Sequence, residues 1–184
     1  MARHRLFTAI DIGARQPLVE LEQRLEKTGA ALKLVEPENI HVTLKFLGDT
    51  EEARIPAVEE AMRTAAADVE PYRATMQGVG VFPHPGYIKV IWIGVDDDGQ
   101  TKQIAETLDD ELAEQGFKKE KHGFTPHATV ARMKGARGKD AVRSLVENHR
   151  ETEFGMLSVE GIQLKKSELQ PDGPVYTTVS DIKL

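Results

Sequence analysis

The sequence predicts an α+β fold, formed by a single domain of residues 1–184 in which one order of elements occurs twice. The first observation is that helical and strand patterns succeed one another along the whole chain. The second is that a helix, a short strand, another helix and a pair of strands follow in this order in both halves. The third is that no low-complexity linker separates the halves, so we expect them to share one core.

The first half carries clear helix and strand patterns. Leu18, Leu21 and Leu25 recur at helical spacing, with Pro17 near the start of this helix and Gly29 beyond its end. Apolar alternation and turn-forming residues mark the strands. The predicted elements are a strand at 5–12, a helix at 16–28, a short strand at 32–35, a strand at 40–47, a helix at 51–68 capped by Thr50, and a strand pair at 72–82 and 88–95.

The second half repeats this order with different residues. Ile104, Leu108 and Leu112 mark a helix that ends at Gly116. The further predicted elements are a strand at 127–133, a helix at 139–148, a strand at 156–164 and a strand at 175–182, with a turn over 171–174 between the last two. The two halves share little sequence identity, so the repeat is one of pattern.

The charge of the chain is −6, but its basic residues are unevenly distributed. Between Gly116 and Arg143, eight basic residues stand against two acidic ones. Such a field can attract a phosphate group, although solvated loops have the same composition. The absence of cysteine excludes disulfides, thiolate nucleophiles and cysteine-ligated zinc, and no apolar run reaches the length of a membrane span. We therefore expect a cytoplasmic protein that does not enter a membrane.

The two halves share one short motif, His-x-Thr followed by an aliphatic residue. It occurs at 41–44 (HVTL) and again at 127–130 (HATV), each time on a predicted strand. Alternate side chains of a strand share a face, so each histidine should lie beside its threonine. One such pair is typical of a solvated sheet face. Two pairs at corresponding places of a repeat are expected to face each other across a cleft.

The same alternation assigns faces to the neighbouring residues. In the first strand, the core face takes Val42, Leu44 and Phe46, and the cleft face takes His41, Thr43 and Lys45. In the second strand, Ala131 is expected on the cleft face beside Thr129. Phe46 is therefore expected to be a core residue rather than a platform for a nucleic-acid base.

Two imidazoles and two hydroxyls in one cleft suit acid–base chemistry on a phosphodiester. Imidazole titrates near neutral pH, so one ring can hold a proton while the other lacks it, and each such group contributes roughly 10²–10⁴-fold. The hydroxyls can donate hydrogen bonds to phosphate oxygens as charge grows there. A cyclic phosphodiester needs water attack on one side and protonation of the leaving oxygen on the other. Two histidines without a third ligand fit zinc poorly, so we expect no metal and no cofactor.

Longer segments around both motifs resemble the signatures of a known family. Residues 37–48 (PENIHVTLKFLG) and 124–132 (FTPHATVAR) look like those of the RNA 2′,3′-cyclic phosphodiesterases, also called 2′-5′ RNA ligases, of the two-histidine phosphoesterase superfamily. Residues 166–169 (KSEL) and 173–176 (GPVY) are similar to the C-terminal segment of that family, so the resemblance covers essentially the whole chain. One departure is Leu34, which stands where many members carry tryptophan.

The resemblance implies a bilobal fold with a pseudo-two-fold duplication, in which two antiparallel β-sheets line a central cleft and helices lie outside. It implies metal-independent hydrolysis of RNA 2′,3′-cyclic phosphate ends to 2′-phosphates, with 2′-5′ RNA ligation in the reverse sense. We expect a monomer whose partners are RNA ends.

The resemblance also implies roles for individual residues. His41 is expected to be the general acid that protonates the departing O3′, and His127 the general base that activates water. The expected phosphate-binding residues are Thr43, Thr129 and Arg132. Because Arg132 follows His127 by five residues, an ideal strand would turn it to the opposite face, and a bulge or a strand end is needed to redirect it. Tyr176 is expected either to stack on a base or simply to pack.

The same residues are compatible with two other functions. The cleft could serve a small cyclic nucleotide instead of RNA, or the chain could be a non-catalytic module that binds nucleotides or RNA ends. Intact histidine and threonine in both motifs argue against the module. Full activity in a strong chelator would exclude a metal hydrolase.

Overall fold

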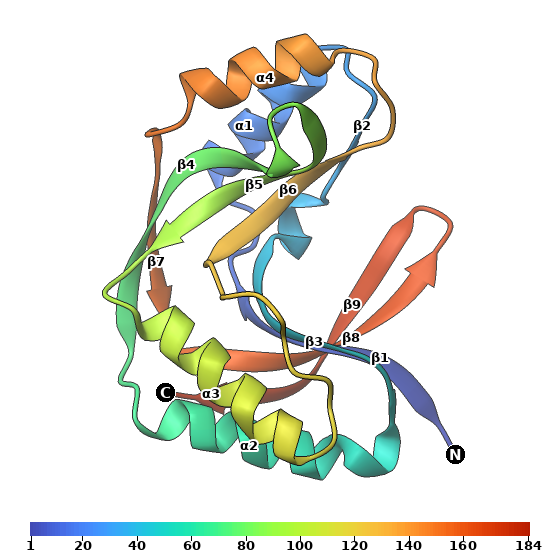
Figure 1. Ribbon diagram of the computed structural model, residues 1–184, viewed down its shortest axis with the longest axis vertical. Helices are drawn as coiled ribbons and strands as arrows, with labels where there is room; N and C mark the ends of the chain where they lie inside the picture. The colour runs from blue at the N-terminus through green and yellow to red at the C-terminus, as the bar shows by residue number, and fades with distance from the viewer.

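The computed structural model describes all residues from Met1 to Leu184 and shows a curled antiparallel sheet with helices on its outer surface (Figure 1). The strands are β1 (Arg3–Asp11), β2 (Leu32–Leu34), β3 (His41–Glu51), β4 (Tyr72–His84), β5 (Tyr87–Asp96), β6 (His127–Met133), β7 (Glu153–Val159), β8 (Gly161–Gln170) and β9 (Gly173–Lys183). The helices are α1 (Gln16–Lys27), α2 (Ile55–Ala67), α3 (Gln100–Glu114) and α4 (Lys139–Asn148). None of them is long and apolar enough to cross a membrane.

The order of strands is symmetric about the centre of the sheet. Neighbours follow as β7-β4-β5-β6-β3-β1-β8-β9, with β2 beside β6. At the centre, β3 and β6 meet through one pair of opposed residues, Val42 and Ala128, whereas β1–β3 and β5–β6 are paired over much of their length. The sheet thus consists of two antiparallel halves joined at the strands that carry the histidines, which confirms the predicted fold class.

Each half of the sheet is covered by one helix from each half of the chain. α2 and α3 pack against each other and contact β3, β8 and β9, whereas α1 contacts β6 and β7 and α4 contacts β4. Figure 1 shows these two helix layers outside the curl, and the concave side of the sheet without a helix. Each half of the sheet also combines strands from both halves of the chain, with β2, β4, β5, β6 and β7 in one and β1, β3, β8 and β9 in the other.

Apolar side chains fill the space between the sheet and the helices. A single cluster of 35 buried residues extends through both lobes. The helix positions that the spacing assigned to the core are buried, namely Leu18, Leu21, Leu25, Ile104, Leu108 and Leu112. The concave face is therefore free to carry polar and aromatic side chains.

The predicted strand over 156–164 is wrong, because the chain passes from one half of the sheet to the other within it. β7 pairs with β4 at one edge of the structure, whereas β8 pairs with β1 and β9 in the other half. The buried residues shift by one position at the crossing, from Leu157 and Val159 to Ile162 and Leu164. Since side chains two residues apart share a face, this shift in phase marks the end of one strand and the start of another.

The helix predicted from residue 51 begins later. β3 extends to Glu51 because β1 pairs with it as far as Arg3, and a short 3₁₀ turn precedes α2. Thr50 lies in the strand, and its hydroxyl donates to the carbonyl of Gly48 at 3.1 Å instead of capping a helix. Pro56 occupies the first turn of α2, where its missing N–H is not needed.

Candidate active site

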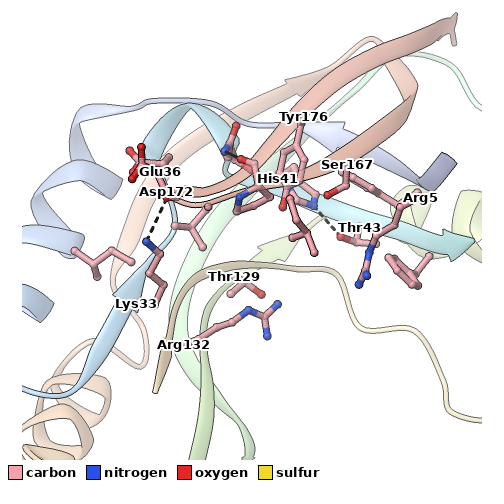
Figure 2. Close-up of a pocket in the computed structure, with 18 of the residues that line it drawn as sticks. Arg5, Lys33, Glu36, His41, Thr43, Thr129, Arg132, Ser167, Asp172 and Tyr176 are labelled. Carbon is pink, nitrogen blue, oxygen red and sulfur yellow. Dashed lines mark hydrogen bonds between the residues drawn. The ribbon is translucent and has the colours of Figure 1, made fainter. Parts of the chain in front are cut away.

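A cleft of about 490 Å³ opens on the concave side, where the two halves of the sheet meet. The predicted site residues that line it are His41, Thr43, His127, Thr129, Arg132 and Tyr176. Figure 2 shows Thr129 and Arg132 on the wall formed by β6, and His41 and Thr43 on the opposing wall formed by β3. Residues more than 80 positions apart in the chain are thus brought together by the symmetric sheet.

The two histidines are held by matching hydrogen bonds to the backbone. Nδ1 of His41 lies 2.7 Å from the carbonyl oxygen of Asn39, and Nδ1 of His127 lies 2.7 Å from that of Thr125. A carbonyl can only accept, so each Nδ1 carries a hydrogen and donates it. Each neutral ring therefore presents an unprotonated Nε2. Nδ1 is occupied by the backbone in both halves, which leaves Nε2 as the nitrogen that can exchange a proton with a substrate.

The threonine beside His41 contacts this free nitrogen directly. The hydroxyl of Thr43 lies 2.9 Å from Nε2 of His41 and donates to it when the ring is neutral (Figure 2). Thr129, two residues after His127, lines the same cleft from the opposite wall. Both hydroxyls are therefore placed where a bound anion between the walls could accept their hydrogen bonds.

Aromatic rings enclose His41. Its ring centre is 5.0 Å from that of Phe7 and 5.4 Å from that of Tyr176, which meets it edge-on. Burial lowers the pKa of His41, against the opposing effects of its hydrogen bond to Asn39 and the negative charge of Asp11. Tyr176, for which stacking and packing were both expected, thus packs on the histidine while lining the cleft.

His127 has its own aromatic neighbours, Phe82 and Trp92. The ring of Phe82 meets it edge-on at 4.9 Å, and that of Trp92 lies at 5.9 Å. Gly80 is required on the neighbouring strand, because a Cβ at this position would lie 2.2 Å from the Trp92 ring. Sequence reasoning missed both aromatics. Only the register of the strands could have indicated Trp92, because this residue of β5 is paired with Thr129 of β6.

A β-bulge directs Arg132 into the cleft. Trp92 is opposite Thr129 and Ile91 is opposite Ala131, so Val130 is the extra residue of the bulge. Both Val130 and Ala131 are buried in succession, and Arg132 then shares the cleft with Thr129. The bulge that the prediction required is therefore present, whereas the cleft position predicted for Ala131 is wrong.

β3 contains the same irregularity, which reverses two predicted faces. Thr8 is opposite Lys45 and Ala9 is opposite Thr43, so Leu44 is the extra residue. Lys45 is consequently buried, and its ammonium donates to Asp109 at 2.6 Å. Phe46, predicted to be core, is 49% exposed and lines the cleft. In both strands the predicted faces reverse because one residue is added at the bulge, whereas strict alternation assumes that no residue is added.

Basic side chains from further strands complete the cleft. Arg5 of β1 lies 5.1 Å from the ring centre of Phe46, and Lys33 of β2 donates to the carbonyl of Asp172 at 3.5 Å. Figure 2 shows Lys33 and Arg132 on the side of β2 and β6. Sequence reasoning missed Arg5 and Lys33 because neither lies near a His-x-Thr motif.

Comparison with known proteins agrees with this architecture. The family model of the 2′-5′ RNA ligase superfamily matches residues 15–169. The chain is 37% identical over 182 residues to an RNA 2′,3′-cyclic phosphodiesterase of Methanothermobacter thermautotrophicus, covering 98% of each. A protein of the same name from Archaeoglobus fulgidus is 36% identical over 174 residues, which cover 94% of this chain and 96% of the relative.

Solved structures share the fold over nearly the whole length. A protein of Thermus thermophilus is 29% identical, with a TM-score of 0.74 and coverage of 98% of this chain and 97% of that one. The structure of E. coli LigT complexed with 3′-AMP has a TM-score of 0.75 at 22% identity, covering 100% and 99% of the two chains. With a family match over most of its residues and curated relatives of nearly equal length, the chain belongs to the 2′-5′ RNA ligase superfamily.

Proposed function

We propose that this protein hydrolyses 2′,3′-cyclic phosphate ends of RNA to 2′-phosphates. The observation that carries the proposal is that two histidines, each with Nδ1 bound to a backbone carbonyl, present Nε2 from opposing walls of one cleft. Relatives that are named RNA 2′,3′-cyclic phosphodiesterases match this chain over nearly their whole length. The proposed reaction requires a proton acceptor on one side of the phosphorus and a proton donor on the other.

In the proposed reaction, Nε2 of His127 accepts a proton from water as the water oxygen bonds to phosphorus. The bond between phosphorus and O3′ breaks, and His41, protonated on Nε2, donates its proton to the departing oxygen. The product is a 2′-phosphate beside a free 3′-hydroxyl. Burial lowers the pKa of His41 in the free protein, and the negative charge of the bound phosphodiester would favour its protonated form.

Three side chains are proposed to hold the phosphate during this step. Thr43 and Thr129 would donate hydrogen bonds to its non-bridging oxygens, and Arg132 would supply a positive charge in the cleft. Arg132 forms no ion pair with a carboxylate, so its guanidinium is available to an anion. Donors fixed before the reaction stabilise the charge that develops on the phosphate oxygens.

The terminal nucleoside is proposed to stack on Phe46. This ring is half exposed within the cleft, and the Arg5 guanidinium lies against it. Aromatic side chains bind bases of any sequence, since every base has a π face. Tyr176 is already engaged with Phe7 and His41, so we assign it to positioning the His41 ring.

Ligation follows from the same arrangement with a different nucleophile. If the 5′-hydroxyl of a second RNA replaces water as the nucleophile, His127 accepts its proton and O3′ leaves as before. The product is then a 2′-5′ phosphodiester. Both reactions use the same two histidines and the same phosphate contacts.

The test is incubation with a short RNA that ends in a 2′,3′-cyclic phosphate, in the presence of a chelator. We expect a 2′-phosphate product, and its loss or severe reduction in His41→Ala and in His127→Ala. Binding without any turnover across neutral pH would favour a binding module. Turnover of a cyclic mononucleotide but not of RNA would favour a small-molecule phosphodiesterase. Activity that survives in either variant would refute the assigned pair.

A further inference from the structure

We propose that a second groove, continuous with the cleft, binds phosphates of the RNA strand that leads to the reacting end. The inference rests on the proposed function and specifies where the rest of its substrate lies. A groove of about 610 Å³ lies beside β5 and β6 and the segment before α4. Arg132 and Lys134 line both this groove and the cleft. A strand whose terminal phosphate lies beside Arg132 can therefore leave the cleft at this point.

The charge of the groove matches a polyanion. Its basic lining residues are Lys89, Arg132, Lys134 and Lys139, and it has no acidic lining residue. None of these four side chains is within ion-pair distance of a carboxylate. On a chain of net charge −6, four unneutralised cations in one groove create a local positive potential. Contacts of this kind with phosphates supply most of the affinity for nucleic acid that does not depend on sequence.

The opposite end of the cleft is less suited to the strand. A hollow of about 920 Å³ lies beyond Thr43 and His127, and its acidic lining residues are Glu106, Asp109, Asp110 and Glu120. Two of its lysines are already neutralised, since Lys45 lies 2.6 Å from Asp109 and Lys119 lies 2.7 Å from Asp110. Phosphates there would meet four carboxylates. Charge therefore selects the groove past Arg132 as the exit of the strand.

Contacts to the backbone hold the walls of the groove. Lys139, at the start of α4, donates to the carbonyl of Gly86 at 2.6 Å, and Arg143 donates to that of Pro85 at 3.1 Å. These bonds tie the tip of the β4–β5 hairpin to α4. Each lysine ammonium has three donors, so Lys139 retains two for a phosphate. The groove is thus formed before any ligand binds.

Tyr87 adds an aromatic face to these charges. Its side chain is 56% exposed and lines the groove, and the ammonium of Lys89 lies 5.3 Å from its ring centre. A register shift between β4 and β5 leaves Lys89 without an opposed residue. Alternating cations and an exposed ring are the means by which proteins bind single strands without reading their sequence.

Two measurements test the groove, one of binding and one of turnover. Binding uses a fluorescent RNA of about ten nucleotides that ends in a 2′-phosphate, the product, and so does not depend on catalysis. Turnover is measured on two substrates, a 2′,3′-cyclic mononucleotide and an RNA that ends in a cyclic phosphate and is as long as the binding probe. The variant is Lys89→Gln combined with Lys139→Gln, because both lysines line the groove but not the cleft. The matched control is Lys102→Gln on α3 in the other lobe.

We expect the double variant to bind the product RNA about tenfold more weakly, and its logarithmic salt dependence to fall by about 1.4, or about 0.7 for each lost phosphate contact. Its kcat/KM on the RNA should fall by a similar factor, while its kcat/KM on the mononucleotide and all values of the control stay within about twofold. Unchanged RNA binding, or equal losses of kcat/KM on both substrates, would refute the proposal that this groove binds the RNA strand. If the wild type binds RNA through these lysines but hydrolyses neither substrate, only the proposed function fails.

Discussion

Phe46 and Arg132 occupy equivalent positions in the two halves of the chain. Each follows a cleft histidine by five residues, and each is turned into the cleft by a β-bulge two residues before it. The backbone symmetry therefore carries different chemistry on its two sides. One wall presents an aromatic face suited to a base, and the other presents a cation suited to a phosphate.

Arg132→Ala should lower kcat/KM on a cyclic phosphate by about 10²–10³-fold, mostly through kcat, because the guanidinium stabilises charge that grows in the transition state. Arg132→Lys should recover part of the loss, since it keeps the charge but not the planar pair of donors. Steady-state kinetics with RNA that ends in a cyclic phosphate measure both. An unchanged kcat in Arg132→Ala would place the arginine outside the phosphate site.

Phe46→Ala should act mainly on KM. Loss of a stacking face costs about 1–3 kcal/mol per base, which predicts a rise in KM of roughly 5- to 150-fold, whereas kcat changes little because the ring is proposed to contact the base and not the phosphate. Phe46→Tyr keeps the face and serves as the matched control. If Phe46→Ala instead unfolds the protein while leaving KM unchanged, the ring belongs to the core after all.

Lys45→Met tests the bulge itself. Lys45 is 4% exposed and its ammonium donates to Asp109 and to the carbonyl of Lys118, so truncation leaves a partly buried carboxylate without its partner. We expect the free energy of unfolding to fall by about 3 kcal/mol, with kcat/KM of the folded fraction nearly unchanged. Lys119→Met, which breaks the exposed pair with Asp110, should change the free energy of unfolding much less, because water screens this pair. Urea unfolding and steady-state kinetics measure both effects. If Lys45 lay on the cleft face instead, Lys45→Met would reduce activity and leave the free energy of unfolding unchanged.

The same bulges explain how far the site could be predicted. The motif residues His41, Thr43, His127 and Thr129 were placed correctly because they precede the bulge in each strand, where alternation still holds. Beyond Leu44 and Val130 the faces reverse, and no local residue type signals an extra residue there. The five-residue spacing between His127 and Arg132 indicated a bulge in β6, because a phosphate-binding arginine must share the face of the histidine. Phe46 follows His41 at the same spacing, and a bulge in β3 places Phe46 in the cleft and Lys45 outside it.

Contacts between segments far apart in the chain were harder to predict from the sequence. The helices are read from spacing within one segment, so α4 begins and ends at the predicted residues. The passage from β7 to β8 depends on which distant strand each one pairs with, β4 or β1. The shift in phase between Val159 and Ile162 marks the end of β7, but it does not indicate which strand β8 pairs with. The groove beside Tyr87 likewise joins a hairpin to a helix about 50 residues later, and only the tertiary structure brings them together.

The pKa of His41 should depend on the rings around it. Burial lowers this pKa in the folded protein, so Tyr176→Ala, which opens one side of the ring to water, should raise it towards its ordinary value. Asp11→Asn should lower it further, because the Asp11 charge favours the imidazolium. NMR titration of the His41 ring protons measures both shifts. Movement of both variants in the same direction would contradict this account.

The lowered pKa of His41 also affects stability. Between that pKa and the ordinary value of about 6.5, the unfolded chain binds a proton that the folded chain does not. Stability should therefore fall as the pH decreases through this window, and this contribution should be absent in His41→Asn. Urea unfolding at several pH values between 5 and 7.5 checks it, with His84→Asn in the exposed hairpin as the control.

Glu22 on α1 should give the opposite dependence on pH. Its side chain is 4% exposed, neither carboxylate oxygen has a hydrogen-bond partner, and burial, with smaller contributions from Glu36 and Glu38, raises its pKa to about 8. The folded chain then keeps a proton that the unfolded chain loses near its ordinary pKa of 4.5. Stability should fall as the pH rises from about 4.5 to 8, by at most about 1.4 kcal/mol per pH unit, and level off above 8.

Glu22→Gln removes this titration while keeping the shape of the side chain. The variant should match the wild type near pH 5 and become the more stable of the two as the pH approaches 8, because only the unfolded wild type gains free energy by releasing the proton that the folded chain keeps. Urea midpoints from pH 5 to 9 measure the difference, with the exposed Glu26→Gln on the same helix as the control. Parallel curves for wild type and Glu22→Gln would mean that the carboxyl is ionised and solvated in the folded protein.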